Sequence, residues 1–194
     1  MGKLLIVNGV KIHDTAEVHS KSDIGEGTII WNNVQIRESS KIGKNCIIGK
    51  DVYIDVGVTL GDNVKVQNGV SIYKGVTVES DVFLGPHIAF TNDMHPRAFN
   101  KDWVIVPTLV KRGASIGANA TIICGTIINS YSMVGAGSVV TKNVPDHGLV
   151  IGNPAKLVGF VCKCGSKLKN KKNIGDLLFF SCQKCKEVVH VKSV

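Results

Sequence analysis

Aliphatic residues recur at every sixth position along most of this chain. The series runs from Ile12 to Phe90 without a break and resumes from Val110 to Val140. The fourth residue after each of these positions is small or β-branched. A period of six matches neither an α-helix nor the strict alternation of a two-sided strand. It predicts short, β-branched strands separated by tight turns.

Three such six-residue units make one coil, so equivalent positions recur three units further along the chain. Stacked coils form a parallel β-solenoid, in which each strand pairs with the strand one coil away at about 4.8 Å. The aliphatic residue then points inward, and the glycine that often follows it, as at Gly43, supplies turn conformations. We therefore predict an all-β solenoid rather than a sandwich, which has no fixed period. Cys46 and Cys124 lie within the repeat and are predicted to be core residues.

The repeat is interrupted once. Phe90 and Val110 are 20 residues apart where the repeat requires six, so fourteen residues are extra, in a loop excursion at about 91–109. The excursion begins with several polar residues, which are Asn92, Asp93, His95 and Arg97. Insertions at one corner of a solenoid often lie on the binding face. The excursion is therefore the first place to expect chemistry.

Composition and charge narrow the class of protein. The chain has 194 residues, 44% of them hydrophobic and 20% charged, which excludes a disordered chain. No apolar run approaches the roughly 20 residues of a membrane helix or the core of a signal peptide. We expect a soluble, cytoplasmic protein with no membrane partner. The net charge is +8, but residues 161–194 carry eight lysines and two acids, so residues 1–160 are almost neutral. A near-neutral body makes nucleic acid an unexpected partner.

The end of the chain carries two close pairs of cysteines. Cys162 and Cys164 form the first pair, and Cys182 and Cys185 follow after a spacer of ordinary zinc-ribbon length. Such pairs are typical of a zinc ribbon, in which four thiolates close the shell of a structural ion. The first pair has one intervening residue where two are usual, and His190 is a spare ligand. Disulfides are the alternative, which a reducing cytoplasm disfavours. We predict a body at 1–160 and a basic, zinc-ribbon-like tail at 161–194.

Residues from about 10 to 158 resemble the hexapeptide-repeat acetyltransferase family. The resemblance implies a left-handed parallel β-helix, a homotrimer with active sites between subunits, and acetyl transfer from acetyl-CoA. Three motifs are similar to one branch of that family, namely Phe90-Thr91-Asn92-Asp93 with Pro96-Arg97, the block at 106–119, and Gly152-Asn153-Pro154-Ala155. Members of that branch acetylate the 3-amino group of nucleotide-linked sugars for bacterial surface polysaccharide. The implied sugar is UDP-2-acetamido-3-amino-2,3-dideoxy-glucuronate, with a dTDP-3-amino-3,6-dideoxyhexose as the alternative.

The excursion supplies the candidate catalytic residues. The site must align a neutral amine with the thioester and remove one proton from it. It must also stabilise the oxyanion that forms on the thioester carbonyl oxygen. Asn92 can hydrogen-bond the amine, Asp93 can accept an ammonium proton, and His95 is of the residue type best suited to act as a general base near neutral pH. The departing thiolate is an alternative proton acceptor. Asn-Asp is also ordinary turn chemistry, and His95 can be a plain loop residue.

Two more residues are candidates for binding the sugar nucleotide. Arg97 has a guanidinium that matches a carboxylate or a diphosphate, with a salt bridge inside the loop as its structural alternative. His87 stands just before the excursion, and its structural alternative is a solvent-facing corner.

A column of small residues predicts the edge that binds CoA. Equivalent positions of successive coils stack along the solenoid, and the column is expected to contain Gly117-Ala118, Gly135-Ala136 and Asn153-Pro154. Backbone N–H and C=O groups left open there can pair with the amides of pantetheine. Turn geometry alone also explains the glycines. The candidates for the CoA phosphates are Lys111, Lys142, Arg112 and Lys156.

Other functions remain open on the same fold. One is O-acetylation of a sugar or an amino acid. Another is a zinc lyase, which needs three histidines on one metal. A third is a non-catalytic solenoid whose tail binds nucleic acid, which salt-dependent binding would reveal.

Overall fold

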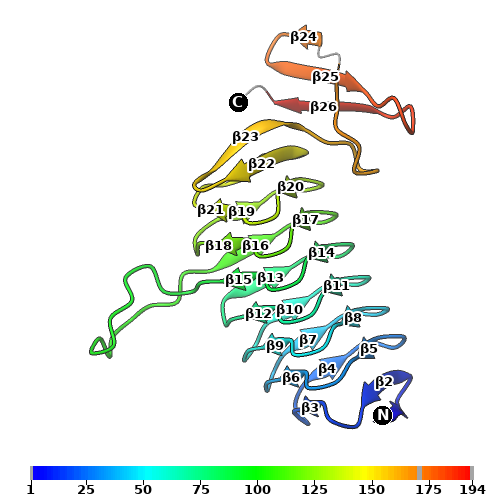
Figure 1. Ribbon diagram of the computed structural model, residues 1–194, viewed down its shortest axis with the longest axis vertical. Coiled ribbons are helices and arrows are strands. Elements are labelled where there is room, and N and C mark those ends of the chain that lie inside the picture. The colour runs from blue at the N-terminus through cyan, green and yellow to red at the C-terminus, as the bar shows by residue number, and fades with distance from the viewer. Residues whose placement is uncertain (1, 170–171, 193–194) are drawn as a thin grey trace.

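The computed structural model describes residues 2–169 and 172–192. Residues 170–171 and 193–194 of the predicted tail, and Met1, lie outside them. The regular elements in the described part of the chain are all strands, which confirms an all-β fold. No helix there is long and apolar enough to span a membrane. The strands build a solenoid of three parallel faces with a small separate sheet at its C-terminal end (Figure 1).

Sheet 1 is the longest face and includes a hairpin at each end. Its strands, in spatial order, are β1 (Leu4–Val7), β2 (Val10–His13), β5 (Ile29–Ile30), β8 (Ile47–Ile48), β11 (Lys65–Val66), β14 (Phe83–Leu84), β17 (Ser115–Ile116), β20 (Met133–Val134), β22 (Gly148–Gly152) and β23 (Ala155–Phe160).

Sheets 2 and 3 form the other two faces, and the tail forms the small sheet. Sheet 2 contains β4 (Asp23–Ile24), β7 (Lys41–Ile42), β10 (Thr59–Leu60), β13 (Val76–Val78), β16 (Thr108–Val110) and β19 (Ile127–Ile128). Sheet 3 contains β3 (Glu17–Val18), β6 (Gln35–Ile36), β9 (Tyr53–Ile54), β12 (Ser71–Ile72), β15 (Ala89–Phe90), β18 (Thr121–Ile122) and β21 (Val139–Val140). The tail sheet contains β24 (Lys172–Ile174), β25 (Leu177–Ser181) and β26 (Val188–Lys192).

The strand register confirms that one coil contains three six-residue repeats. Lys65 pairs with Ile47 on one side and with Phe83 on the other, which is a shift of three repeats in each direction. Across the excursion Phe83 pairs with Ser115, a longer separation along the chain. The difference between the two separations is fourteen positions, which is the length of the insertion that the repeat predicted.

The core is the column of aliphatic side chains inside the solenoid. Ile30, Leu84 and Ile116 are completely buried, as are most members of the series. Burial is weaker at the N-terminal end, where Ile12 and Val18 are only partly covered because fewer coils flank them. Cys46 and Cys124 are buried, as predicted.

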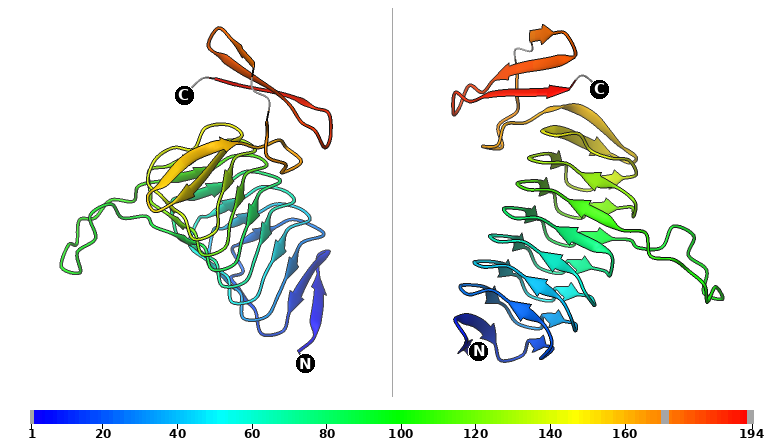
Figure 2. Two further views of the ribbon diagram at one scale, coloured as in Figure 1. Left: turned by 45° about the horizontal axis from the view of Figure 1, so that its top comes forward. Right: turned by 180° about the vertical axis from the view of Figure 1, so that it is seen from behind.

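The solenoid has three corners, which are named here by the sheets they join. The first corner runs from sheet 1 to sheet 3 and includes Ala118. The second runs from sheet 3 to sheet 2 and includes Lys74. The third runs from sheet 2 back to sheet 1 and includes Asp81. Residues in the left-handed conformation make these turns, as at Asp81 (φ 64°) and Gly137 (φ 68°). The excursion leaves the solenoid at the second corner and projects well clear of it (Figure 2).

The two ends of the solenoid depart from the repeat. At the start, β1 pairs antiparallel with β2 through a turn at Asn8 (φ 49°) and Gly9 (φ 77°), a left-handed pair typical of two-residue hairpins. At the other end, Met133 pairs with Leu149, so the last coil is shorter by two positions than the coils before it.

The shorter last coil corrects one prediction. Ile151, not Asn153, follows Gly135 in the column, since a Cβ on Gly135 would lie 2.9 Å from the Ile151 Cγ1. Asn153 and Pro154 instead form the tip of the β22–β23 hairpin, joined by a cis peptide bond. The strand of sheet 2 shrinks to a single bridge at Val144, because Pro145 cannot extend a hydrogen-bonded ladder.

Candidate functional site

The excursion is anchored at its base and exposed at its tip. Val106 donates its N–H to the Asn92 carbonyl (2.9 Å), and Gly125 donates to the Pro107 carbonyl (3.0 Å). Farther out, Phe99 is 82% exposed and Trp103 is 44% exposed. Large apolar groups at a loop tip are poorly placed in a single protomer, because water surrounds them.

The predicted catalytic residues share this loop, and local hydrogen bonds hold two of them. The Asn92 side-chain amide donates to the Lys74 carbonyl (3.2 Å), which ties the excursion to the coil before it. The Asp93 carboxylate accepts the N–H of His95 (2.8 Å) and thereby shapes the turn. Arg97 donates to the Pro96 carbonyl (2.8 Å). His95 and Arg97 are exposed, whereas Asn92 and Asp93 are half-buried.

His87 lies at a different corner from the excursion. It occupies the first corner in a left-handed conformation (φ 57°), with its ring packed beside Gly69. Strand β15 separates His87 from Asn92, a span of at most about 16 Å for five residues of extended chain. Within one protomer these two candidates are therefore on opposite ends of a solenoid face.

The glycines of the predicted CoA column are required by the close approach of successive coils. A Cβ on Gly85 would lie 2.7 Å from the Ala118 nitrogen, and one on Gly117 would lie 2.5 Å from the Ala136 nitrogen. A carbonyl of this column already accepts a hydrogen bond within the protein, because the Gly137 N–H donates to the Ala118 carbonyl (2.8 Å). The prediction that backbone carbonyls are open there is wrong at that position, since the next coil satisfies them.

Unlike the carbonyl groups, some N–H groups of the same column have no hydrogen-bond partner in the described part of the chain. Earlier in this corner the Lys50 N–H donates to the Asn68 side chain (3.0 Å) one coil away. The equivalent N–H groups of Ala118 and Ala136 have no protein acceptor among the described residues. The capping position one coil later holds Ala136 for the first donor and Gly152 for the second, so neither donor meets a polar side chain there and both are available for a ligand.

The predicted phosphate-binding lysines are distributed over the other corners. Lys111 follows β16 at the third corner and is half-buried, and Lys142 follows β21 at the second corner and is exposed. The structure thus brings Asn92, Asp93 and His95 together on one loop. It does not bring them near Lys111 or the alanine column within one protomer.

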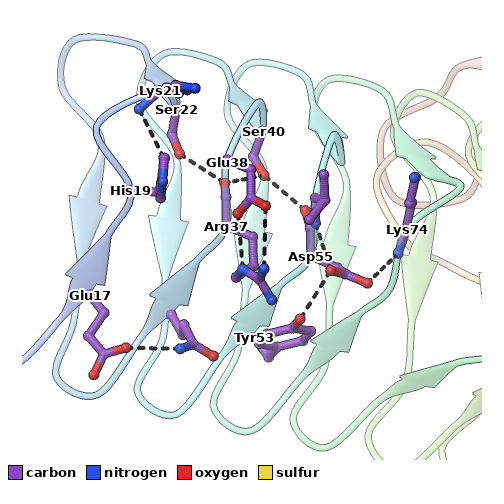
Figure 3. A network of polar contacts seen from close by, with 12 residues as sticks. Glu17, His19, Lys21, Ser22, Arg37, Glu38, Ser40, Tyr53, Asp55 and Lys74 are labelled. Carbon is purple, nitrogen blue, oxygen red and sulfur yellow. Dashed lines mark hydrogen bonds and ion pairs between the residues drawn. The ribbon is translucent and has the colours of Figure 1, made fainter.

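A polar network runs along the second corner as far as Lys74 (Figure 3). Asp55 accepts the Tyr53 hydroxyl (3.0 Å) and the N–H of Val56 (2.8 Å), and its other oxygen accepts the N–H of Lys74 (3.1 Å). Burial raises the pKa of Asp55, but these hydrogen bonds outweigh it and leave the pKa below its ordinary value. Since Lys74 also accepts from Asn92, the network links Asp55 to the base of the excursion.

Sequence reasoning missed Asp55 and Lys74. The signal that could have found Lys74 is its position one full coil before Asn92, at the equivalent place in the repeat. Next to the network, Arg37 pairs with Glu38 (3.1 Å). A backbone N–H and Arg37 both lower the pKa of Glu38.

The four tail cysteines converge as the sequence predicted. Their sulfurs lie within 4.8 Å of one another, with Cys162 and Cys185 at 3.4 Å and Cys164 and Cys182 at 3.6 Å. Burial raises the pKa of Cys162 to about 12, and hydrogen bonds from Ser166 lower the pKa of Cys164 to about 6. His190 is not a member of the cluster and packs beside Phe179 instead. The geometry is that of a site that can hold one metal ion.

Two family models match the solenoid. The model described as "Hexapeptide repeat of succinyl-transferase" matches residues 41–74 and 112–142. The model described as "Bacterial transferase hexapeptide (six repeats)" matches residues 21–56. These stretches lie on both sides of the excursion and do not include the tail.

Curated relatives match parts of the chain. It is 63% identical over 62 residues to dTDP-3-amino-3,6-dideoxy-alpha-D-galactopyranose 3-N-acetyltransferase from Aneurinibacillus thermoaerophilus, a match that covers 32% of this chain and 32% of that enzyme. It is 42% identical over 80 residues to serine acetyltransferase 4 from Arabidopsis thaliana, covering 41% of this chain and 19% of the relative. The chain therefore matches well under two thirds of the length of either relative.

Solved structures share the fold. The polySia-specific acetyltransferase NeuO aligns with a TM-score of 0.56 at 20% identity, over 77% of this chain and 76% of the other. A mutant of GDP-perosamine N-acetyltransferase from Caulobacter crescentus, solved with CoA and GDP-perosamine, aligns with a TM-score of 0.53 at 24% identity, over 81% of this chain and 58% of the other. At these identities the likeness is one of fold.

Proposed function

Because the chain belongs to the hexapeptide-repeat acetyltransferase family, we propose that it transfers the acetyl group of acetyl-CoA to the amino group of a nucleotide-linked amino sugar. The observation that carries this proposal is the high identity with an enzyme named as a dTDP-3-amino-sugar N-acetyltransferase. The polar excursion supports it, because a solenoid needs no such loop for its own stability.

The proposed path of CoA is the first corner. The free N–H groups of Ala118 and Ala136 are one coil apart, about 4.8 Å, and can donate to the amide carbonyls of the pantetheine arm. The exposed tip at Asn153 and Pro154 stands at the end of this edge. Lys111 and Lys142 lie at other corners, so in this proposal they meet the phosphates of CoA bound against a neighbouring copy of the chain.

The proposed active site is completed by a second subunit of a homotrimer. Asn92 and His95 lie on a loop that projects away from its own solenoid, whereas the CoA edge lies at another corner. A loop that reaches a neighbouring subunit brings the two parts together. Phe99 and Trp103 would then be covered at the subunit contact, which removes apolar surface from water.

The proposed chemistry needs alignment more than reactive groups. The amine nitrogen attacks the thioester carbonyl, a C–N bond forms, the C–S bond breaks, and CoA leaves as a thiol with the proton given up by nitrogen. Asn92 orients the amine, and His95 receives the proton before it passes to sulfur. His87, from the neighbouring first corner, and Arg97 bind the sugar nucleotide, and Asp93 holds the turn that carries His95.

Two sugar nucleotides compete as the substrate. The relative's name favours a dTDP-3-amino-3,6-dideoxyhexose. The exposed guanidinium of Arg97 favours a sugar with a carboxylate, as in UDP-2-acetamido-3-amino-2,3-dideoxy-glucuronate. We expect the dTDP sugar to react faster, because the identity with its enzyme is the stronger observation.

The test measures CoA thiol release from acetyl-CoA with each sugar nucleotide and with L-serine as a third acceptor. Asn92→Ala is expected to lower kcat by about 100-fold, the usual scale for losing a positioning or charge-stabilising contact. Asn100→Ala is the matched control, since it removes an exposed asparagine of the same loop whose side chain accepts the Asp102 N–H (3.0 Å) at the tip rather than at the base, and it should leave kcat unchanged.

The outcomes separate the acceptor from the reaction. Faster turnover of the UDP-uronate would keep N-acetyl transfer and change the sugar. Turnover of L-serine alone would contradict an amino-sugar acceptor. Equal losses for Asn92→Ala and Asn100→Ala would contradict a specific role for Asn92.

A further inference from the structure

The proposed acetyl transfer makes no use of the tail. Residues 161–194 form a short unit, and its described part contains a three-stranded sheet. Its small core is built from Phe160, Leu168, Leu178, Phe180, Val189 and Val191, together with Cys162 and Cys182. A unit below about 40 residues usually needs a metal, disulfides or another chain to fold. The tail therefore needs a further source of stability.

We propose that Cys162, Cys164, Cys182 and Cys185 bind one structural zinc ion, and that this ion holds the tail as a cap on the last coil of the solenoid. Zinc–thiolate bonds of about 2.3 Å in a tetrahedron place the sulfurs about 3.8 Å apart. The closest sulfur pairs here, at 3.4 and 3.6 Å, fit that spacing. A disulfide would require about 2.05 Å.

Both sulfur pairs join the two turns rather than closing one turn on itself. The Cys162 sulfur lies 3.4 Å from that of Cys185, and the Cys164 sulfur lies 3.6 Å from that of Cys182. The single residue between Cys162 and Cys164 does not prevent this, because the turn tightens through a bond from the Gly165 N–H to the Cys162 carbonyl (2.8 Å). One ion at the centre would link the chain leaving β23 to the β25–β26 hairpin.

The surroundings suit a thiolate shell. On binding zinc the four thiols give up their protons, and the site carries two negative charges. Lysines flank the ligands in both turns, as at Lys163 and Lys184. Four protein ligands leave no open position, so the site is structural rather than catalytic.

The tail rests on the solenoid directly beside this cluster. Val161 donates to the His147 carbonyl (2.7 Å), and its own carbonyl lies 2.8 Å from the His147 Nδ1. Lys163 lies 5.3 Å from the centre of the Tyr131 ring and pairs with Glu187 (2.8 Å). Cys162 and Cys164 flank these contacts, so an ion bound there fixes the contact residues as well.

The last coil is specialised to receive the tail. At the third corner, the left-handed position is filled by Asn45, Asn63, Asp81 and Gly113 in earlier coils, but by Tyr131 (φ 55°) and His147 (φ 59°) at the end. Histidine tolerates this conformation, as His87 also shows, but it is rare for a bulky residue such as Tyr131 and persists there only where the surroundings compensate for it. The two rings stack at 5.4 Å beneath Lys163. Docking of the tail is the compensation that the structure offers.

The first test counts metal and thiols in the purified full chain. Elemental analysis should find about one zinc per chain, and thiol titration after denaturation with a chelator should find all six cysteines reduced. Cys164→Ser should lose the zinc. Cys46→Ser is the matched control, because serine already stands at equivalent interior positions such as Ser40, and it should retain the zinc.

The second test asks whether the ion holds the cap. Hydrogen exchange of the wild-type protein is compared before and after zinc removal with a strong chelator. We expect amides of residues 177–192 to exchange at least about 10-fold faster without zinc, while those of residues 47–72 remain unchanged.

Four results would overturn the proposal. Only two titratable thiols would mean disulfides, six thiols without metal would mean an empty cluster, and iron in place of zinc would reject the identity of the ion. Unchanged exchange of the tail after zinc removal would reject the cap. None of these readouts depends on acetyl transfer, so the zinc proposal is tested independently of the proposed function.

Discussion

A single methyl group added at Gly117 should separate two coils of the solenoid. A Cβ there would lie 2.5 Å from the Ala136 nitrogen, 2.8 Å from its Cα and 2.9 Å from the Gly135 carbonyl carbon. All three are backbone atoms, so no side chain can rotate away. Gly137 is the matched contrast, because a Cβ there meets nothing within 4 Å but its φ is +68°.

The two substitutions cost free energy for different reasons. Relief of the contacts at Gly117 requires about 1 Å of separation, since carbon and nitrogen pack at about 3.5 Å. That shift would break the bond from the Gly117 N–H to the Val134 carbonyl, now 2.8 Å. Overpacking and a lost hydrogen bond together predict about 3 kcal/mol for Gly117→Ala. Gly137→Ala carries only the cost of the left-handed conformation, about 1 kcal/mol.

Equilibrium unfolding in urea, followed by far-ultraviolet circular dichroism at one protein concentration, measures both values. The expected difference of about 2 kcal/mol corresponds to about 4–8 °C in Tm for a chain of this size. If Gly137→Ala destabilises as much as Gly117→Ala, the spacing of the coils is not limited by backbone contact at this corner, and the reasoning fails.

Three further predictions concern the core and the second corner. Thr108 has a buried hydroxyl without a hydrogen-bond partner in the described part of the chain, so Thr108→Val should be neutral or stabilise by about 1 kcal/mol in urea unfolding, and a clear loss would reveal a missed partner. Leu84→Ala should cost about 2–5 kcal/mol because the side chain is fully buried, whereas Lys65→Ala on an exposed position should stay within about 0.5 kcal/mol. The folded-state pKa of Asp55 is lowered, so its stabilisation is present above the unfolded pKa of about 3.9 and is lost as the pH falls through the folded pKa. From pH 5 to pH 3 the wild type should lose more stability than Asp55→Asn, and equal slopes would contradict this assignment.

The solenoid could be predicted because its defining interactions repeat. Each inward aliphatic residue, such as Ile116, pairs with the equivalent residue one coil away. An aliphatic residue at every sixth position therefore predicts where a strand lies, which side chain points inward and which strand it pairs with. The length of the excursion followed by subtraction. The tail cysteines were also predictable, because their short spacings restrict them to two turns.

The ends of the repeat were not predictable in the same way. Where neighbours on one side run out, the chain pairs with itself, as in the hairpins β1–β2 and β22–β23. The six-residue periodicity does not predict the strand pairing at these two ends. The shorter last coil displaced Asn153 and Pro154 from the column in which a count of full coils placed them.

The sequence by itself determined the coil, its core and the residue types available for chemistry, because these depend on local periodicity and on composition. Only the tertiary structure decided which corner each candidate occupies. His87 and Asn92 are close in the chain yet stand at different corners, while Asp55 and Asn92 are linked through Lys74 across two coils. The reason is that a corner of a solenoid collects residues that are a full coil apart, so nearness along the chain and nearness in space are different quantities.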